Sequence, residues 1–67
     1  MKKTLLKNLK NGEFFTRKPN EYPEDRQVLI RSNYCKENKK FSCYHFDDVN
    51  KEIFLKGETI VYTDFIF

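Results

Sequence analysis

Apolar and polar residues alternate over short runs of this chain, a pattern that is typical of β-strands and not of helices. The alternation is clearest over Gln27–Tyr34, where Val28 and Ile30 are separated by a single residue. A polar turn at 36–39 follows, and Phe41–Phe46 then predicts the returning strand of a hairpin. We therefore expect an antiparallel strand pair in the middle of the chain.

Residues 1–12 admit two interpretations. Leu5, Leu6 and Leu9 could line one side of a short amphipathic helix. However, helices shorter than roughly 12–15 residues need packing to survive. We prefer a short strand or extended arm that ends in a turn at 10–12, where Asn and Gly tolerate a positive φ.

Glu13–Lys18 predicts a further strand. Its alternate residues would occupy opposite faces, Phe14 and Thr16 on one and Phe15 and Arg17 on the other.

The second half of the chain predicts two more strands between polar segments. Residues 19–26 form a loop punctuated by proline, and 47–50 form a second polar turn. Ile53–Leu55 and Thr59–Phe67 are then expected to make a last hairpin, with Gly57 supplying the positive φ of its turn.

These elements predict an all-β fold of five or six strands in a single small antiparallel sheet, arranged as a meander or a partly closed SH3-like barrel. Residues 1–67 would form one domain. The composition agrees, because the chain has seven Phe, four Tyr and no alanine. A chain of 67 residues excludes two-domain enzymes, Rossmann units and α/β barrels, which need roughly 150 residues or more. Closure would also cover the apolar strand 65–67, which could otherwise pair with another chain.

The two cysteines are expected to be free thiols. If residues 37 and 38 form the hairpin tip, opposed residues pair in a fixed register. The expected pairs are Tyr34 with Phe41, Ser32 with Cys43, Cys35 with Lys40 and Arg31 with Tyr44. This register places Cys35 and Cys43 on opposite faces, so no intrachain disulfide can form.

No residue pattern indicates catalysis, a metal or a cofactor. Cys43, His45 and Asp47 could share a strand face, but zinc sites normally draw ligands from two elements and no second Cys/His pair exists. Asp47 and Asp48 would point to opposite faces, and one of them is expected to cap the backbone of the following turn. We therefore expect a protein that is not an enzyme.

The chain has a formal net charge of +3, which is a mild basic excess. Single-stranded nucleic acid is therefore one class of partner that the sequence suggests. The candidate binding surface combines cations with aromatic rings near the hairpin tip: Arg31, Tyr34, Lys36, Lys39, Lys40 and Tyr44. Glu37 lies within this cluster and weakens it. The competing interpretation is that Tyr34 and Phe41 form a cross-strand pair in the core, with the lysines as a solvated tip.

Protein recognition is the function that we prefer from the sequence. Seven Phe and four Tyr are more aromatic side chains than so small a core can hide, so some should form an exposed patch. The partner would be another protein or a second copy of the chain, reached through this patch or by edge pairing of Thr59–Phe67. No signal peptide or transmembrane run is evident, so a reducing cytoplasmic setting is expected.

Several short segments resemble a group of small uncharacterised proteins carried by bacteriophages and mobile elements of gut bacteria. The similar positions are Tyr34, Cys43–Asn50, Lys56–Gly57 and Leu9–Phe15. The resemblance implies a small accessory protein, such as a host-takeover, anti-defence or regulatory factor, that acts by binding. It supplies no catalytic or binding residues.

Overall fold

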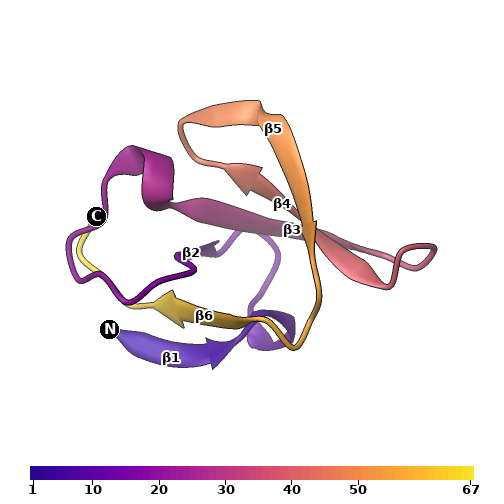
Figure 1. Ribbon diagram of the computed structural model, residues 1–67, viewed down its shortest axis with the longest axis horizontal. Coiled ribbons are helices and arrows are strands. Elements are labelled where there is room, and N and C mark those ends of the chain that lie inside the picture. The colour runs from indigo at the N-terminus through magenta and orange to yellow at the C-terminus, as the bar shows by residue number, and fades with distance from the viewer.

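The computed structural model describes all residues from 1 to 67, and they form six strands and two short 3-10 turns without any α-helix. In chain order the elements are β1 (Lys2–Leu5), η1 (Leu6–Asn8), β2 (Phe14–Phe15), η2 (Asp25–Gln27), β3 (Leu29–Cys35), β4 (Lys40–His45), β5 (Asp48–Leu55) and β6 (Ile60–Thr63). The strands make two antiparallel sheets, β1-β6 and β2-β3-β4-β5, as Figure 1 shows. The all-β prediction is confirmed, whereas the single sheet was wrong.

The chain divides into two sheets because the expected strand at Glu13–Lys18 bends after two residues. Phe15 pairs with Leu29 in the four-stranded sheet. Thr16 instead forms an isolated bridge with Tyr62, in which each backbone N–H donates to the other residue's carbonyl at 3.0 and 2.9 Å. Phe15 and Thr16 are both buried, so the predicted alternation of faces fails at this bend.

The β3–β4 hairpin keeps the predicted register only near its tip. Tyr34 pairs with Phe41 and Cys35 with Lys40, as expected. Beyond this point a β-bulge shifts the pairing, so that Cys43 faces Arg31 instead of Ser32. For the same reason Tyr44 faces Ile30 and not Arg31.

The bulge lies where the preceding turn docks on β3. The N–H of Gly12 donates to the Arg31 carbonyl at 2.7 Å, and the N–H of Arg31 donates to Glu13 at 3.0 Å. The Asn11 amide donates to the Asn33 side chain at 2.8 Å. Gly12 has φ = 92°, so the predicted turn at 10–12 is confirmed, together with the short strand before it.

The predicted last hairpin does not form. β6 pairs with β1, in a register that joins Lys2 to Thr63, and Thr16 bridges its other side. Gly57 does not adopt a positive φ. Glycine is favoured there by close packing, because a Cβ at Gly57 would lie 3.1 Å from the Lys7 Cβ and 3.2 Å from a Phe41 ring carbon.

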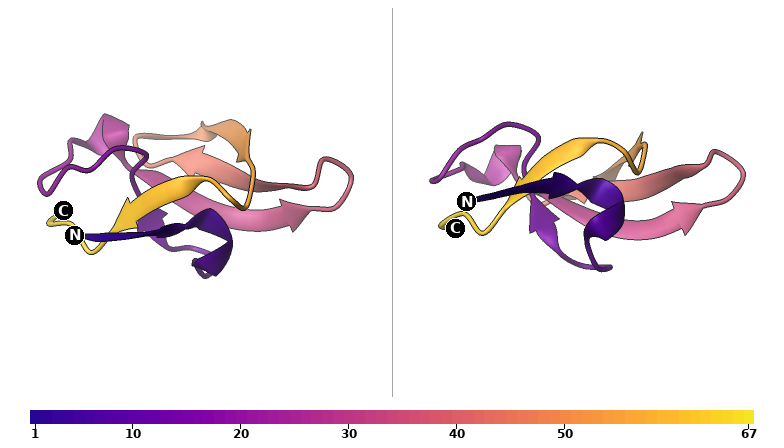
Figure 2. Two further views of the ribbon diagram at one scale, coloured as in Figure 1. Left: turned by 60° about the horizontal axis from the view of Figure 1, so that its bottom comes forward. Right: turned by 90° about the horizontal axis from the view of Figure 1, so that it is seen from below.

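Two further boundaries differ from expectation. The predicted turn at 47–50 is shorter, because β5 already starts at Asp48. Residues 65–67 are not a strand, since β6 ends at Thr63 and Asp64 turns the chain with φ = 59°. The tail is then held by the Ile66 N–H, which donates to the Glu21 carbonyl at 2.8 Å. Figure 1 and Figure 2 show that the two ends of the chain lie at the same end of the molecule, opposite the tip of the β3–β4 hairpin.

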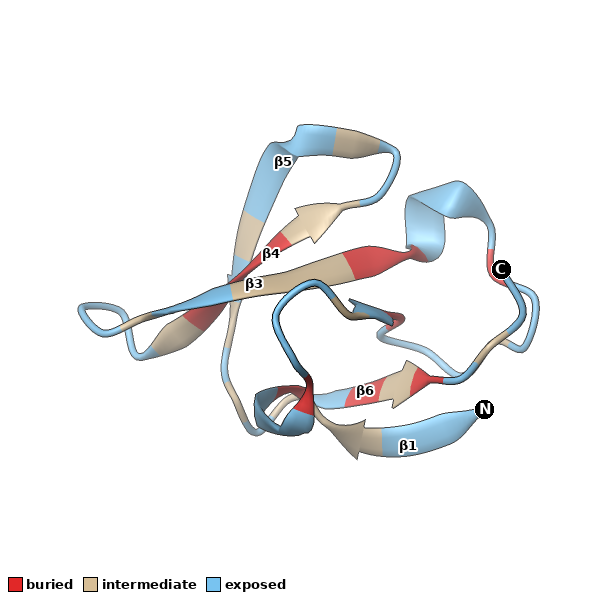
Figure 3. Cartoon of the chain, turned by 180° about the vertical axis from the view of Figure 1, so that it is seen from behind, coloured by how far each residue is buried: buried red, intermediate tan, exposed pale blue.

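The core lies between the two sheets and is small. It consists of Leu6, Leu9, Phe15, Leu29, Phe41, Cys43 and Val61, with Ile53 and Leu55 packed against it. Figure 3 shows the tip of the β3–β4 hairpin projecting away from these buried segments. Phe15 and Phe41 are the only buried aromatic residues, so most of the aromatic side chains lie outside the core. No helix of the structure is long and apolar enough to cross a membrane.

Candidate functional site

The structure places Arg31 and Tyr34 against Phe41, on the face of the sheet that carries the core. The Arg31 guanidinium carbon lies 4.2 Å from the Phe41 ring centroid. The Tyr34 and Phe41 rings meet edge to face, with centroids 5.0 Å apart. The cross-strand aromatic pair is therefore present. Phe41 belongs to the core, while Tyr34 remains 47% exposed.

The six residues of the predicted surface do not form one continuous patch. Tyr44 lies opposite Ile30 and Glu52, on the face turned away from Phe41 and Cys43. The lysines of the turn and of the start of β4 range from exposed to half-buried: Lys36, Lys39 and Lys40. Tyr44 is thus separated by the sheet from Arg31 and Tyr34.

A shallow depression beside the hairpin gathers part of the predicted surface with a residue that sequence reasoning missed. Its volume is about 360 Å³, and its walls include Lys7, Tyr34, Lys39 and Phe41, together with the acidic Glu58. Lys7 comes from η1, far away in the sequence. Its N–H donates to the Gly57 carbonyl at 3.0 Å, a contact that no local pattern could indicate.

The largest aromatic cluster lies elsewhere, and we call Phe14, Phe46 and Phe67 the phenylalanine surface. Their ring centroids are 5.5 Å apart for Phe14–Phe46, 6.0 Å for Phe14–Phe67 and 4.8 Å for Phe46–Phe67, all edge to face. Phe65 touches its border, 6.2 Å from Phe67. The three rings remain 40%, 37% and 49% exposed.

Three separate segments build the phenylalanine surface. Phe14 lies in β2, opposite Ile30. Phe46 lies in the β4–β5 turn, where its N–H donates to the Val28 carbonyl at 3.0 Å. Phe67 arrives with the tail that follows Asp64. The expected aromatic excess is therefore found partly in the tail 65–67, which the sequence analysis singled out, and partly at Phe14 and Phe46, which it did not single out for binding.

The residues considered for chemistry are dispersed or buried. No group of three or more His, Cys, Asp or Glu side chains lies close enough to hold a metal ion. The two cysteines are free, as predicted. Burial raises the pKa of the Cys43 thiol to about 11, although the Arg31 guanidinium and a Ser32 backbone hydrogen bond act in the opposite direction. The Asp48 carboxylate accepts the Asn50 N–H at 3.1 Å, but this contact lies at the start of β5 and not in a turn that follows Asp48.

A scan against protein-family models, a search of curated proteins and a search of solved structures each returned no match. Functional inference for this chain therefore depends on its own surfaces.

Proposed function

We propose that the protein is a small non-enzymatic binding module that acts through protein–protein contacts at the phenylalanine surface. The observation that carries this proposal is the cluster of three rings that pack on one another while each stays at least a third exposed. Aromatic side chains are enriched at protein interfaces because they bury a large area at a small entropic cost.

Mutual packing makes the phenylalanine surface ready to bind. Each ring is held by the other two, so a partner would order few side chains on contact. Fully burying a Phe side chain contributes roughly 1.5–3 kcal/mol, and the exposed part of each ring leaves about 1 kcal/mol of this to be gained. Three such rings can form the centre of a modest interface.

A second copy of the chain is the partner to test first. Phe46 lies just before β5, whose outer edge is unpaired in the four-stranded sheet. A two-fold contact could join the phenylalanine surfaces of two copies beside their β5 edges. β6 offers less free edge than β5, because β1 pairs along one side of it and Thr16 bridges Tyr62 on the other.

Sedimentation velocity over a wide concentration range tests this proposal with matched variants. Phe46→Ser should weaken association roughly tenfold, because it removes one central ring. Ile60→Ser is the control, since Ile60 lies in β6, away from β5, and is also about half exposed. If the wild type is monomeric, a photo-crosslinking residue at position 46 should capture a host protein more strongly than one at 60. Equal capture at both positions would refute the proposal.

The alternative function is binding of single-stranded nucleic acid at the depression beside the hairpin. It is supported by the half-exposed Tyr34 ring between Lys7 and Lys39, since a ring flanked by cations can stack a base and contact its phosphates. Fluorescence anisotropy with a labelled oligonucleotide should show affinity that falls steeply with salt. Tyr34→Ala should weaken it by about tenfold or more, whereas Tyr22→Ala at another exposed tyrosine should not. An absence of binding at low ionic strength would exclude this alternative.

We also propose an arrangement of the two sheets, a biological origin and a cellular location for the protein. The Thr16–Tyr62 bridge links the segment that follows β2 to the two-stranded sheet, which supports a partly closed SH3-like arrangement. The sequence resemblance supports an accessory factor of phages or mobile elements, and the proposed place of action is the cytoplasm. Expression as a tagged protein with fractionation of the host cell tests the location.

A further inference from the structure

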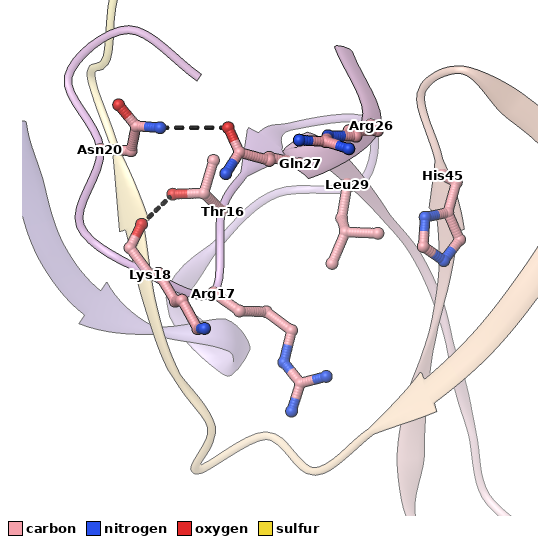
Figure 4. A pocket seen from close by; sticks show the side chains of 8 residues that line it. All are labelled: Thr16, Arg17, Lys18, Asn20, Arg26, Gln27, Leu29 and His45. Carbon is pink, nitrogen blue, oxygen red and sulfur yellow. Dashed lines mark hydrogen bonds between the residues drawn. The ribbon is translucent and has the colours of Figure 1, made fainter. Parts of the chain in front are cut away.

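A polar pocket of about 530 Å³ opens at the end of the molecule opposite the hairpin tip (Figure 4). Arg17 and Lys18 line one side, just after the bend at Thr16. Arg26 contributes from η2, and His45 from the end of β4. Pockets of roughly 300–1,000 Å³ are the usual size for small-molecule sites. Neither the phenylalanine surface nor the depression beside the hairpin shares a residue with this pocket.

The segments that carry the cations are held in place by hydrogen bonds. The Thr16 hydroxyl donates to the Lys18 carbonyl at 2.8 Å, which fixes the backbone that bears Arg17 and Lys18. The Asn20 amide donates to the Gln27 side-chain oxygen at 3.1 Å, which ties the loop to η2. Figure 4 shows both bonds beside the pocket, with Leu29 between Arg26 and Arg17.

The pocket concentrates positive charge. Its lining contains three Lys and Arg side chains and no carboxylate. These are three of the thirteen Lys and Arg residues of the chain. Outside the lining, the Glu24 carboxylate lies 3.1 Å from the Arg26 Nε, and this pair is largely solvent-exposed and therefore weak.

We propose that this pocket binds a phosphate group, carried either by a mononucleotide or by the 5′ end of a nucleic-acid strand. Arg17, Lys18 and Arg26 are exposed. Rotation of the two arginine side chains toward the pocket would let each guanidinium bind phosphate oxygens with paired N–H donors, while the Lys18 ammonium would add a point charge. Three cations around one volume favour a phosphate dianion over a singly charged carboxylate. The Gln27 amide nitrogen and the His45 ring add neutral hydrogen-bonding groups at the border.

Two-dimensional amide NMR of the full chain tests this proposal with adenosine monophosphate, adenosine and inorganic phosphate as probes. Adenosine monophosphate should bind saturably and shift the amides around Thr16–Lys18, Arg26 and His45. Adenosine should not bind. Oligonucleotides with and without a 5′ phosphate then distinguish the two sources, because only the phosphorylated strand should shift the same amides if a strand end is the ligand.

Matched double variants separate a formed site from general electrostatic attraction. Arg17→Gln/Arg26→Gln should weaken binding of adenosine monophosphate by roughly tenfold or more, because each arginine supplies charge-assisted hydrogen bonds. Lys36→Gln/Lys39→Gln removes the same charge at the other end of the molecule and should change the affinity less than about twofold. If the arginine variant fails to fold, the exposed Lys18→Gln replaces it.

Equal losses in the two double variants would overturn the proposal, as would adenosine binding as tightly as adenosine monophosphate or an absence of saturable binding. Self-association through the phenylalanine surface is measured independently with Phe46→Ser. That variant should retain binding of adenosine monophosphate. Each proposal can therefore fail without affecting the test of the other.

Discussion

Cys43 illustrates how a strand register determines the chemistry of a single residue. The bulge in β3 places it opposite Arg31, and its side chain is completely buried in the core. The Arg31 Nε is itself buried without a hydrogen-bond partner. Burial dominates over the nearby guanidinium, so the pKa of the thiol is raised to about 11 from an ordinary value of 9.0. Cys43 is therefore a neutral core residue and not a nucleophile.

This raised pKa predicts a dependence of stability on alkaline pH. The folded state disfavours the Cys43 thiolate, so the contribution is fully present below pH 9 and is lost as pH rises toward about 11. Relative to Cys43→Ala, the wild type should lose about 2 kcal/mol of unfolding free energy over this interval. Urea unfolding under reducing conditions at several pH values measures the difference.

Val61→Ala is the control for that measurement, because it also truncates a buried core residue but removes no ionisable group. Its difference in unfolding free energy from the wild type should stay constant over the same pH interval. A constant difference for Cys43→Ala as well would show that the thiol does not titrate differently in the folded and unfolded states.

At the scale of elements, the bent segment of β2 and Thr16 joins the two sheets. Phe15 belongs to the four-stranded sheet through Leu29, and the next residue bridges Tyr62 in the two-stranded sheet. A two-stranded sheet is only marginally stable alone in water. The pair β1-β6 therefore depends on the bend, and on the core residues beneath it, for its stability.

We predict that the two sheets open together. The Tyr62 amide, which donates to Thr16, and the Arg31 amide, which donates to Glu13, should show similar protection in native-state hydrogen exchange. Amides of the exposed turn at 36–39 give the fast-exchange reference. Exchange at Tyr62 that is faster by orders of magnitude than at Arg31 would show that the two-stranded sheet opens alone.

At the scale of the whole molecule, sequence reasoning succeeded where the determinants are local. The alternation over 27–34 and the polar tip gave the β3–β4 hairpin and the pairing of Tyr34 with Phe41. Two free thiols also followed from the hairpin, although the bulge changed the partner of Cys43. The all-β fold class follows from the composition. The turn at 10–12 follows from Gly12, a residue that tolerates a positive φ.

Distant contacts determine what the sequence could not indicate. The bulge in β3 is set by a turn some twenty residues earlier in the chain, through Gly12 and Asn11. Gly57 is constrained by the approach of Lys7 and Phe41, which no local pattern reveals. The phenylalanine surface and the pocket around Arg17 and Arg26 each draw residues from three or more segments.

The pairing of β1 with β6 also bears on how the protein is made. Lys2 pairs with Thr63, so β1 must wait for its partner until residues 60–63 have been synthesised. Contacts of such long sequence separation slow folding, because a large loop must close before they form. The β3–β4 hairpin can form before β6 has been synthesised, whereas the completed fold requires β6. Nascent chains of this protein should therefore meet chaperones and proteases with the hairpin formed and β1 still unpaired.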